Sequence, residues 1–244
     1  MNNFEEMLKK GNLNLSEREL RIFEEFVATR DKLEREQIKN TIVMFGTART
    51  KFDDDNLSAR HFYEANYNLS YKLATWVKNR YKDSSPSDKY YICTGGGGGA
   101  MEAANKGASS AGERTIGFNI QLPFEQSSNP YIPSNLVFKF HYFFIRKFFF
   151  ASLAKAFVIF PGGFGTMDEL FEIMTLSQTH KMQKTIPFVL FGTKFFKEVL
   201  NFDMLLKYGY ISESDKELFI MTDSVDEAYE HIINNIEKDK SLIN

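Results

Sequence analysis

A glycine-rich turn between a short apolar run and a helical pattern constrains this chain more than any other feature. Residues 161–169 read PGGFGTMDE, directly after the apolar run 156–160 and directly before a helix-like spacing of apolar residues. Backbone N–H groups at a helix start lack partners within the helix and lie at the positive end of its dipole, and glycines let a ligand approach them closely. The junction therefore predicts a turn that binds a phosphate.

Thr166 is expected to cap that helix, with Glu169 three residues further along. The same spacing is typical of a capping box, in which the glutamate only accepts from the backbone N–H of the cap residue. Spacing alone leaves the functional and the structural interpretation open. A second glycine-rich junction, TGGGGGAMEAANKGA at 94–108, follows another β-like run at 89–93. It favours the functional interpretation, because two such turns in one chain rarely serve structure alone.

Strand-like and helix-like segments alternate along the chain from residue 41 onward. This alternation predicts a doubly wound, parallel, Rossmann-like α/β sheet with helices on both faces, whose ligands bind beyond the carboxyl ends of the strands. Residues 1–40 are charged and helically periodic, so we expect an N-terminal helical extension before a nucleotide-hydrolase domain at 41–240. The expected strands are 41–45, 89–93, 115–121, 156–160, 186–191 and 218–221, and the main expected helices are 57–81, 101–112, 195–206 and one after a Ser224–Glu227 capping box.

Composition excludes several classes of protein. The 30 basic and 32 acidic residues give a formal charge of −2, so no bulk charge favours nucleic acid or an anionic membrane. The single Cys93 excludes an internal disulfide, and we expect a soluble, unexported, cytoplasmic protein because no apolar stretch has the length of a signal peptide or a membrane span. The four histidines lack the spacing of a metal site, so we expect neither a metal nor a cofactor.

The segment 138–150 is dense in aromatic residues and is interrupted by the pair Arg146 and Lys147. A helix with apolar residues on every face usually lies in a core or a subunit contact, so we expect it to be buried nearly all round and to favour a homodimer. The charged pair needs a partner or a ligand, since an unpaired buried charge is costly. It could equally be a structural ion pair or a pair that keeps only its charged heads in water.

Other chemistries find less support in the sequence. The run 95–99 loosely fits the dinucleotide pattern, but five consecutive glycines match almost any glycine motif, and the next predicted strand ends in Gln121 rather than an acid. Neither glycine turn ends in the Gly-Lys-Ser/Thr of a P-loop, and no G-x-S-x-G nucleophile elbow is present. A dehydrogenase is therefore a weak alternative.

With these residues in hand, the chain resembles the LONELY GUY (LOG) family, whose signature is P-G-G-x-G-T-x-x-E preceded by an Arg-Lys pair. PGGFGTMDE fits the signature, and Arg146-Lys147 stands at the usual distance upstream. The resemblance implies a Rossmann-like homodimer that hydrolyses the N-glycosidic bond of nucleoside 5′-monophosphates to a free base and ribose 5-phosphate. The base would be a cytokinin in some members and adenine or another ordinary base in others.

The same resemblance assigns roles to residues. It implies that Arg146 and Glu169 are the catalytic pair, with Glu169 stabilising positive charge on the sugar and orienting or deprotonating water, and Arg146 holding Glu169 ionised or binding phosphate. The other implied substrate or phosphate contacts are Gly97, Gly98, Glu125, Lys147, Gly162, Gly163, Gly165, Thr166 and Thr175. A non-catalytic protein that senses a nucleotide through the same turn is the alternative.

Overall fold

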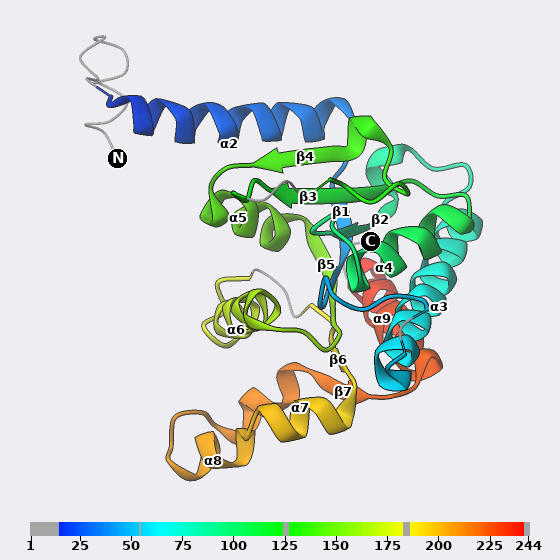
Figure 1. Ribbon diagram of the computed structural model, residues 1–244, viewed down its shortest axis with the longest axis vertical. Coiled ribbons are helices and arrows are strands. Elements are labelled where there is room, and N and C mark those ends of the chain that lie inside the picture. The colour runs from blue at the N-terminus through cyan, green and yellow to red at the C-terminus, as the bar shows by residue number, and fades with distance from the viewer. Residues whose placement is uncertain (1–14, 54, 124–126, 183–185, 242–244) are drawn as a thin grey trace.

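A seven-stranded parallel sheet organises the computed structural model, which describes residues 15–53, 55–123, 127–182 and 186–241 (Figure 1). The strands lie in the order β4-β3-β2-β1-β5-β6-β7, and all neighbours pair in parallel. The chain builds from β1 out to β4 and then returns to the other side of β1, so the order reverses between β1 and β5. The strands are β1 (Asn40–Phe45), β2 (Tyr90–Thr94), β3 (Thr115–Ile120), β4 (Val137–Phe140), β5 (Ala154–Ile159), β6 (Phe188–Phe191) and β7 (Ile220–Thr222).

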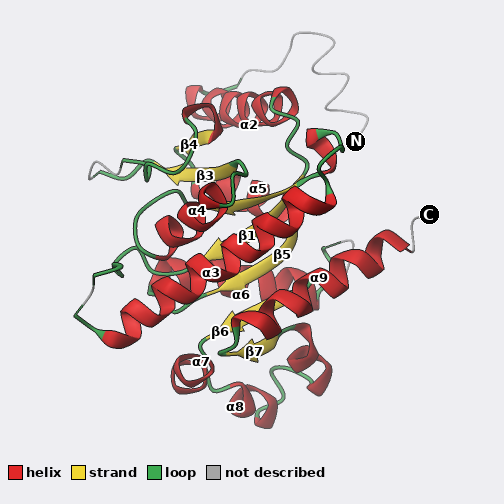
Figure 2. Ribbon diagram, turned by 90° about the vertical axis from the view of Figure 1, so that its right-hand side faces the viewer, coloured by secondary structure: helices red, strands yellow, loops and turns green. Residues whose placement is uncertain are grey.

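Helices cover both faces of this sheet (Figure 2). One face carries α3 (Leu57–Arg80), α4 (Ala100–Ser110) and α9 (Val225–Ser241), and the other carries α5 (Phe143–Leu153), α6 (Phe164–Gln178) and α7 (Thr193–Val199). The N-terminal helix α2 (Glu17–Arg35) lies beside β4 and α5 (Figure 1). The predicted doubly wound, Rossmann-like class is confirmed. None of the described helices is long and apolar enough to cross a membrane.

The position of β1 at the centre of the sheet explains why its sequence is an unbroken apolar run. Ile42 and Met44 belong to the core beneath α3, α4 and α9, whereas Val43 and Phe45 belong to the core on the opposite face. All four side chains are buried. A strand of a parallel sheet that is covered on both faces has no solvent side on which to place polar residues.

The aromatic helix α5 is not buried all round, so that expectation is wrong for the single chain. Its inward side chains Ile145, Phe149 and Phe150 are buried. The sheet and α2 cover only part of its circumference, and Phe26 of α2 packs 5.2 Å from the ring of Phe149. The side chains of Phe143, Phe144 and Phe148 remain 49%, 54% and 50% exposed.

The segment expected to form one helix over 195–206 is two helices, α7 and α8 (Phe202–Lys207). Leu200 between them is extended, with φ −121° and ψ 108°. The side chain of Asn201 then accepts a hydrogen bond from the backbone N–H of Met204 at 3.0 Å and starts α8. The expectation of a single helix is wrong because an asparagine side chain offers the backbone an alternative partner.

The two edge strands of the sheet also differ from what the sequence predicts. The strand β4 was not predicted, and it pairs with β3 from Gly117↔Val137 to Ile120↔Phe140. At the other edge, β7 begins only at Ile220, because a 3-10 helix occupies Glu213–Leu218.

The expected capping box before α9 is only half formed. The Ser224 hydroxyl accepts from the N–H of Glu227 at 3.3 Å, as the spacing predicts. The Ser224 N–H, however, donates to the hydroxyl of Thr222, which in turn donates to the Glu227 carboxylate. Thr222 therefore stands between the two groups that a capping box would join directly.

Candidate active site

A pocket of about 800 Å³ lies at the carboxyl ends of β1 and β5, where the strand order reverses. Its walls come from the turn after β1, the PGGFGT turn after β5, and the helices α5 and α6. The N–H of Thr47 donates to the carbonyl of Pro161 at 3.0 Å, and the N–H of Ala100 donates to the carbonyl of Thr47 at 2.8 Å. These bonds tie the turns after β1, β2 and β5 together and fix the pocket at the position where open α/β sheets bind ligands.

The PGGFGT turn leads directly into α6, which begins at Phe164. Gly163 is the residue that precedes the helix, and it has no side chain to cap the exposed amides. Thr166 lies in the first turn of α6, where its N–H donates to the carbonyl of Gly163, so the expectation that Thr166 caps the helix is wrong. The first amides of α6 have no carbonyl partner within the helix and remain available to an anion.

The three glycines of this turn serve different purposes. A Cβ at Gly162 would lie 2.1 Å from the hydroxyl oxygen of Thr166, so this position needs glycine for packing. A Cβ at Gly163 or Gly165 would meet no atom within 4 Å. Both glycines line the pocket, so this space is where a ligand can approach the backbone.

Arg146, Lys147 and Glu169 form a buried ion cluster at this pocket. Arg146 Nη2 lies 3.2 Å from Glu169 Oε1, and Lys147 Nζ lies 3.3 Å from Glu169 Oε2. The side chains are 12%, 11% and 4% exposed respectively. Because the Glu169 carboxylate is bound by the two cations rather than by the N–H of Thr166, the capping-box interpretation of this spacing is wrong.

Burial and charge act in opposite directions within the cluster. Burial raises the pKa of Glu169, while Lys147 and Arg146 lower it without cancelling the rise. Burial lowers the pKa of Arg146, although the neighbouring Glu169 opposes the change. Burial also lowers the pKa of Lys147, but its hydrogen bonds to Glu172 and Asp168 outweigh burial and leave that pKa raised. Such opposed shifts within a pocket are typical of functional sites.

One N–H donor of Arg146 has no partner among the described residues. Its guanidinium carbon lies 5.2 Å and 5.7 Å from the ring centroids of Phe143 and Phe150, which hold the group in place. Its Nε is buried, and among the described residues it has no hydrogen-bond partner. A buried donor without an acceptor is costly, and a ligand oxygen in the adjacent pocket could satisfy it.

The first glycine-rich turn, Gly95–Gly99, needs glycine for its backbone conformation and packing. Gly96 and Gly99 adopt φ values of +74° and +64°, and a Cβ at Gly99 would lie 2.4 Å from the Thr47 carbonyl. The buried side chain of Asn129 donates to the carbonyls of Gly96 and Gly97 at 3.2 Å and 2.9 Å. No local pattern predicted a role for Asn129, because it lies in a proline-rich loop between the predicted elements.

The remaining candidate residues lie apart from the ion cluster. Gly95 lines the pocket, whereas Gly97 contacts Asn129 and Gly98 faces the backbone of Ala48. Thr175 is exposed on α6, and its hydroxyl donates to the carbonyl of Phe171. Glu125 lies outside the described residues. The turn after β1 also supplies Thr47 and Arg49, which were not among the expected site residues.

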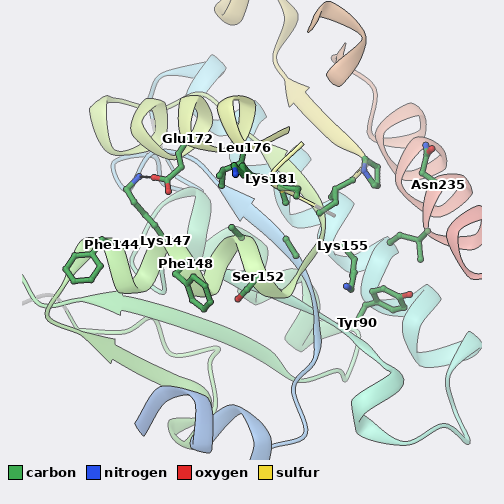
Figure 3. A pocket seen from close by; sticks show the side chains of 16 residues that line it. Tyr90, Phe144, Lys147, Phe148, Ser152, Lys155, Glu172, Leu176, Lys181 and Asn235 are labelled. Atoms are coloured by element: carbon green, nitrogen blue, oxygen red, sulfur yellow. Dashed lines mark ion pairs between the residues drawn. The ribbon is translucent and has the colours of Figure 1, made fainter. Parts of the chain in front are cut away.

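A second hollow, of about 650 Å³, lies on the other side of Lys147 (Figure 3). It runs between α5 and α6, and the Lys147–Glu172 ion pair lies at one end of it (Figure 3). Neither Arg146 nor Glu169 lines it. Arg146 and Glu169 therefore belong to the pocket at the carboxyl ends of the strands, whereas Lys147 lines the second hollow.

Metal and thiol chemistry have no visible site in the described part of the chain. No group of three or more His, Cys, Asp or Glu side chains is placed there to hold a metal ion. Cys93 is buried within β2, and burial raises the pKa of its thiol well above the ordinary value. A protonated thiol in the core is a poor nucleophile.

Fold and site together define a Rossmann-like α/β protein with an open, glycine-flanked helix start and a buried Arg–Lys–Glu cluster at the point where the strand order reverses. The sequence profile of the family described as "Possible lysine decarboxylase" matches residues 101–232, more than half of the chain. The chain belongs to this family, to which the LOG proteins also belong.

Two curated relatives come from Oryza sativa subsp. japonica. The probable cytokinin riboside 5′-monophosphate phosphoribohydrolase LOG4 is 29% identical over 136 residues, which cover 54% of this chain and 57% of the relative. The cytokinin riboside 5′-monophosphate phosphoribohydrolase LOG is 30% identical over 129 residues, 52% of each chain. The match thus spans about half the length of the curated relatives.

Solved structures share the fold at lower identity. A structural genomics target superposes with a TM-score of 0.54 at 22% identity, over 82% of this chain and 99% of its own. A molybdenum cofactor binding protein from Rippkaea orientalis gives 0.52 at 17% identity, over 84% and 98%. A Moco carrier protein from Chlamydomonas reinhardtii gives 0.51 at 22% identity, over 82% and 99%. These likenesses show the architecture alone.

Proposed function

We propose that this chain hydrolyses the N-glycosidic bond of nucleoside 5′-monophosphates, releasing a free base and ribose 5-phosphate. The observation that carries the proposal is the Arg146–Glu169 ion pair beside the open start of α6 in one pocket, with Lys147 bound to the other carboxylate oxygen of Glu169. The two curated relatives, which are named as phosphoribohydrolases of a nucleoside monophosphate, support the same reaction class. We propose AMP and cytokinin riboside 5′-monophosphates as the first substrates to test.

In the proposed reaction, the amides at the start of α6 bind the 5′-phosphate, so that binding energy far from the reacting bond aligns the sugar. Water adds its oxygen to C1′ while the bond from C1′ to the base breaks, and the base leaves with that electron pair and gains a proton. Positive charge builds on the sugar in the transition state, and the Glu169 carboxylate stabilises it and orients the water. Arg146 keeps that carboxylate in place and ionised through their 3.2 Å contact.

Amino acid decarboxylation, which the family description mentions, finds less support in the chemistry of the site. That reaction commonly uses pyridoxal phosphate, whose attachment requires a lysine that can lose its proton. Lys147 is the lysine bonded to Glu169, and its contacts with Asp168, Glu169 and Glu172 leave its pKa raised. A lysine held protonated in this way is unsuited to forming a Schiff base.

The experiment is a panel of AMP, GMP, CMP, UMP and isopentenyladenosine 5′-monophosphate, with released base and ribose 5-phosphate measured by chromatography. We expect turnover of at least one monophosphate and little of the matching nucleoside, which lacks the phosphate. Glu169→Gln should lower kcat by about 10²–10⁴-fold, because the amide can neither accept a proton nor offset charge on the sugar. Calorimetry on this variant should still detect nucleotide binding.

A nucleotide carrier or sensor is the second candidate, and the names of two proteins of similar fold, a cofactor-binding protein and a cofactor carrier, favour testing it. Tight nucleotide binding without product after long incubation of the wild-type protein would support a carrier and contradict the hydrolase. An active Glu169→Gln variant would contradict the role proposed for Glu169 but not the proposed hydrolysis itself.

We also propose that the protein works as a homodimer in the cytoplasm. The half-exposed phenylalanines of α5 motivate the dimer, because a monomer rarely leaves so many apolar rings in water. The single free and buried Cys93 is compatible with a reducing compartment. Fractionation of the source cells would test the compartment.

A further inference from the structure

The N-terminal helix α2 reaches the helix that carries Arg146 and Lys147. Glu25 of α2 places its carboxylate at the start of α5, where Oε2 accepts from the N–H of His141 at 2.8 Å and Oε1 accepts from the N–H of Tyr142 at 3.2 Å. These residues are more than a hundred positions apart in the sequence. A side chain from a separate segment thus serves as the cap of α5.

The start of α5 needs such a cap. Tyr142 precedes the helix and supplies no side-chain cap, and the first turn of α5 contains no acidic residue. Arg146 and Lys147 follow as the fourth and fifth residues of the helix, so two positive charges lie near the positive end of its dipole. The Glu25 carboxylate offsets this unfavourable charge and binds the N–H of Tyr142, the residue that precedes the helix.

A short chain of contacts leads from Glu25 to the ion cluster. Glu25 holds the N–H of Tyr142, and the carbonyl of Tyr142 accepts from the N–H of Arg146 at 3.3 Å. The guanidinium of Arg146 then meets the carboxylate of Glu169. If the first turn of α5 unwound, the backbone of Arg146 would lose its anchor and the side chain would shift relative to Glu169.

Contacts elsewhere on α2 keep Glu25 in position. Lys32 Nζ donates to the carbonyl of Val137 at 2.7 Å and lies 4.5 Å from the ring centroid of Phe138, which attaches the far end of α2 to β4. The ring of Phe26, next to Glu25, packs against α5. The helix α2 is therefore fixed both at α5 and at β4, and Figure 1 shows it running beside β4.

We propose that Glu25 is a positioning residue for the catalytic pair, and that the N-terminal helix braces the start of α5 so that Arg146 and Lys147 meet Glu169. The kinetic part of this inference rests on the proposed hydrolase function. The structural part, that Glu25 protects the first turn of α5, stands independently of the reaction.

The test compares Glu25→Ala and Glu25→Gln with Glu24→Ala, which removes the same charge from the exposed neighbouring position of α2. Amide hydrogen exchange read by mass spectrometry should be faster over 141–147 in Glu25→Ala and less so in Glu25→Gln, which keeps one acceptor oxygen. Glu24→Ala should exchange like the wild type. Unchanged exchange over 141–147 in Glu25→Ala would overturn the proposal, whether or not the protein hydrolyses nucleotides.

The kinetic readout separates positioning from general stability. With an active monophosphate, Glu25→Ala should lower kcat about tenfold with KM within about twofold, since a small misplacement of a catalytic group is costly. The acidic limb of its pH profile should move to higher pH, because a displaced Arg146 lowers the pKa of Glu169 less. Lys78→Met removes a hydrogen bond to the carbonyl of Ala111, away from α2 and α5, and should lower Tm without these changes. An equal loss of kcat in Lys78→Met would overturn the positioning role.

Discussion

At the scale of the residue, Glu169 is held between two cations, one on each carboxylate oxygen, and yet burial keeps its pKa above the ordinary value. The proposed mechanism needs the ionised carboxylate. Activity should therefore fall as the pH drops through this raised pKa, so that the acidic limb of kcat/KM against pH lies above the ordinary pKa of a glutamate.

Lys147→Gln should move that acidic limb further, and the direction follows from charge. Lys147 lowers the pKa of Glu169, so its removal makes the carboxylate harder to ionise and shifts the limb to higher pH. A profile of kcat/KM from about pH 4 to 9, fitted for the free enzyme, measures the shift. Lys155→Gln, a change in the second hollow that leaves the ion pairs of Glu169 intact, is the control. A limb that moved to lower pH in Lys147→Gln would contradict the assigned electrostatics.

At the scale of the element, the glycines in the turn before α6 have two roles that substitutions can distinguish: close packing at Gly162 and access for a ligand at Gly165. Gly165→Ala places a methyl group in open space within a helix, so the variant should be more stable, by up to about 1 kcal/mol. The same methyl group enters the pocket, so affinity for ribose 5-phosphate should fall. Thermal unfolding and calorimetry measure the two effects.

Gly162→Ala is the matched comparison for that turn. Its methyl group would collide with the buried, β-branched side chain of Thr166, so this variant should lose stability. If Gly165→Ala bound the sugar phosphate as well as the wild type does, the open start of α6 would not be the phosphate site.

The sequence predicted the elements well where the chain's own pattern decides them and less well where a distant partner does. Local residue types predict a strand, a glycine-rich turn and a helix in succession, and the structure contains β5, the PGGFGT turn and α6 at these positions. Thr166 and Asn201 are cases in which the local pattern was not enough. Whether either side chain caps a helix depends on the backbone geometry around it, which residue spacing does not encode. The cap that Glu25 provides for α5 joins segments far apart in the chain, and no local pattern signals it.

At the scale of the whole molecule, the exposed rings of α5 predict self-association. Phe144→Ser should shift the protein from dimer to monomer, because it removes a half-exposed apolar ring from the face we assign to the contact. Light scattering coupled to size-exclusion chromatography measures the mass. Tyr208→Ser, a change at another exposed ring directly after the distant helix α8 (Figure 1), should leave the mass unchanged. A wild-type protein of monomer mass would contradict the prediction.

The position of β1 in the sheet has a consequence for synthesis on the ribosome. It is the first strand to be made, yet its second neighbour, β5, ends only at Ile159. Until that point a nascent chain can assemble β1 to β4, but β1 keeps an apolar, unpaired edge of the kind that recruits other strands. Pauses in translation or premature stops before Ile159 should therefore yield fragments that aggregate or engage chaperones, while longer chains close the sheet on themselves.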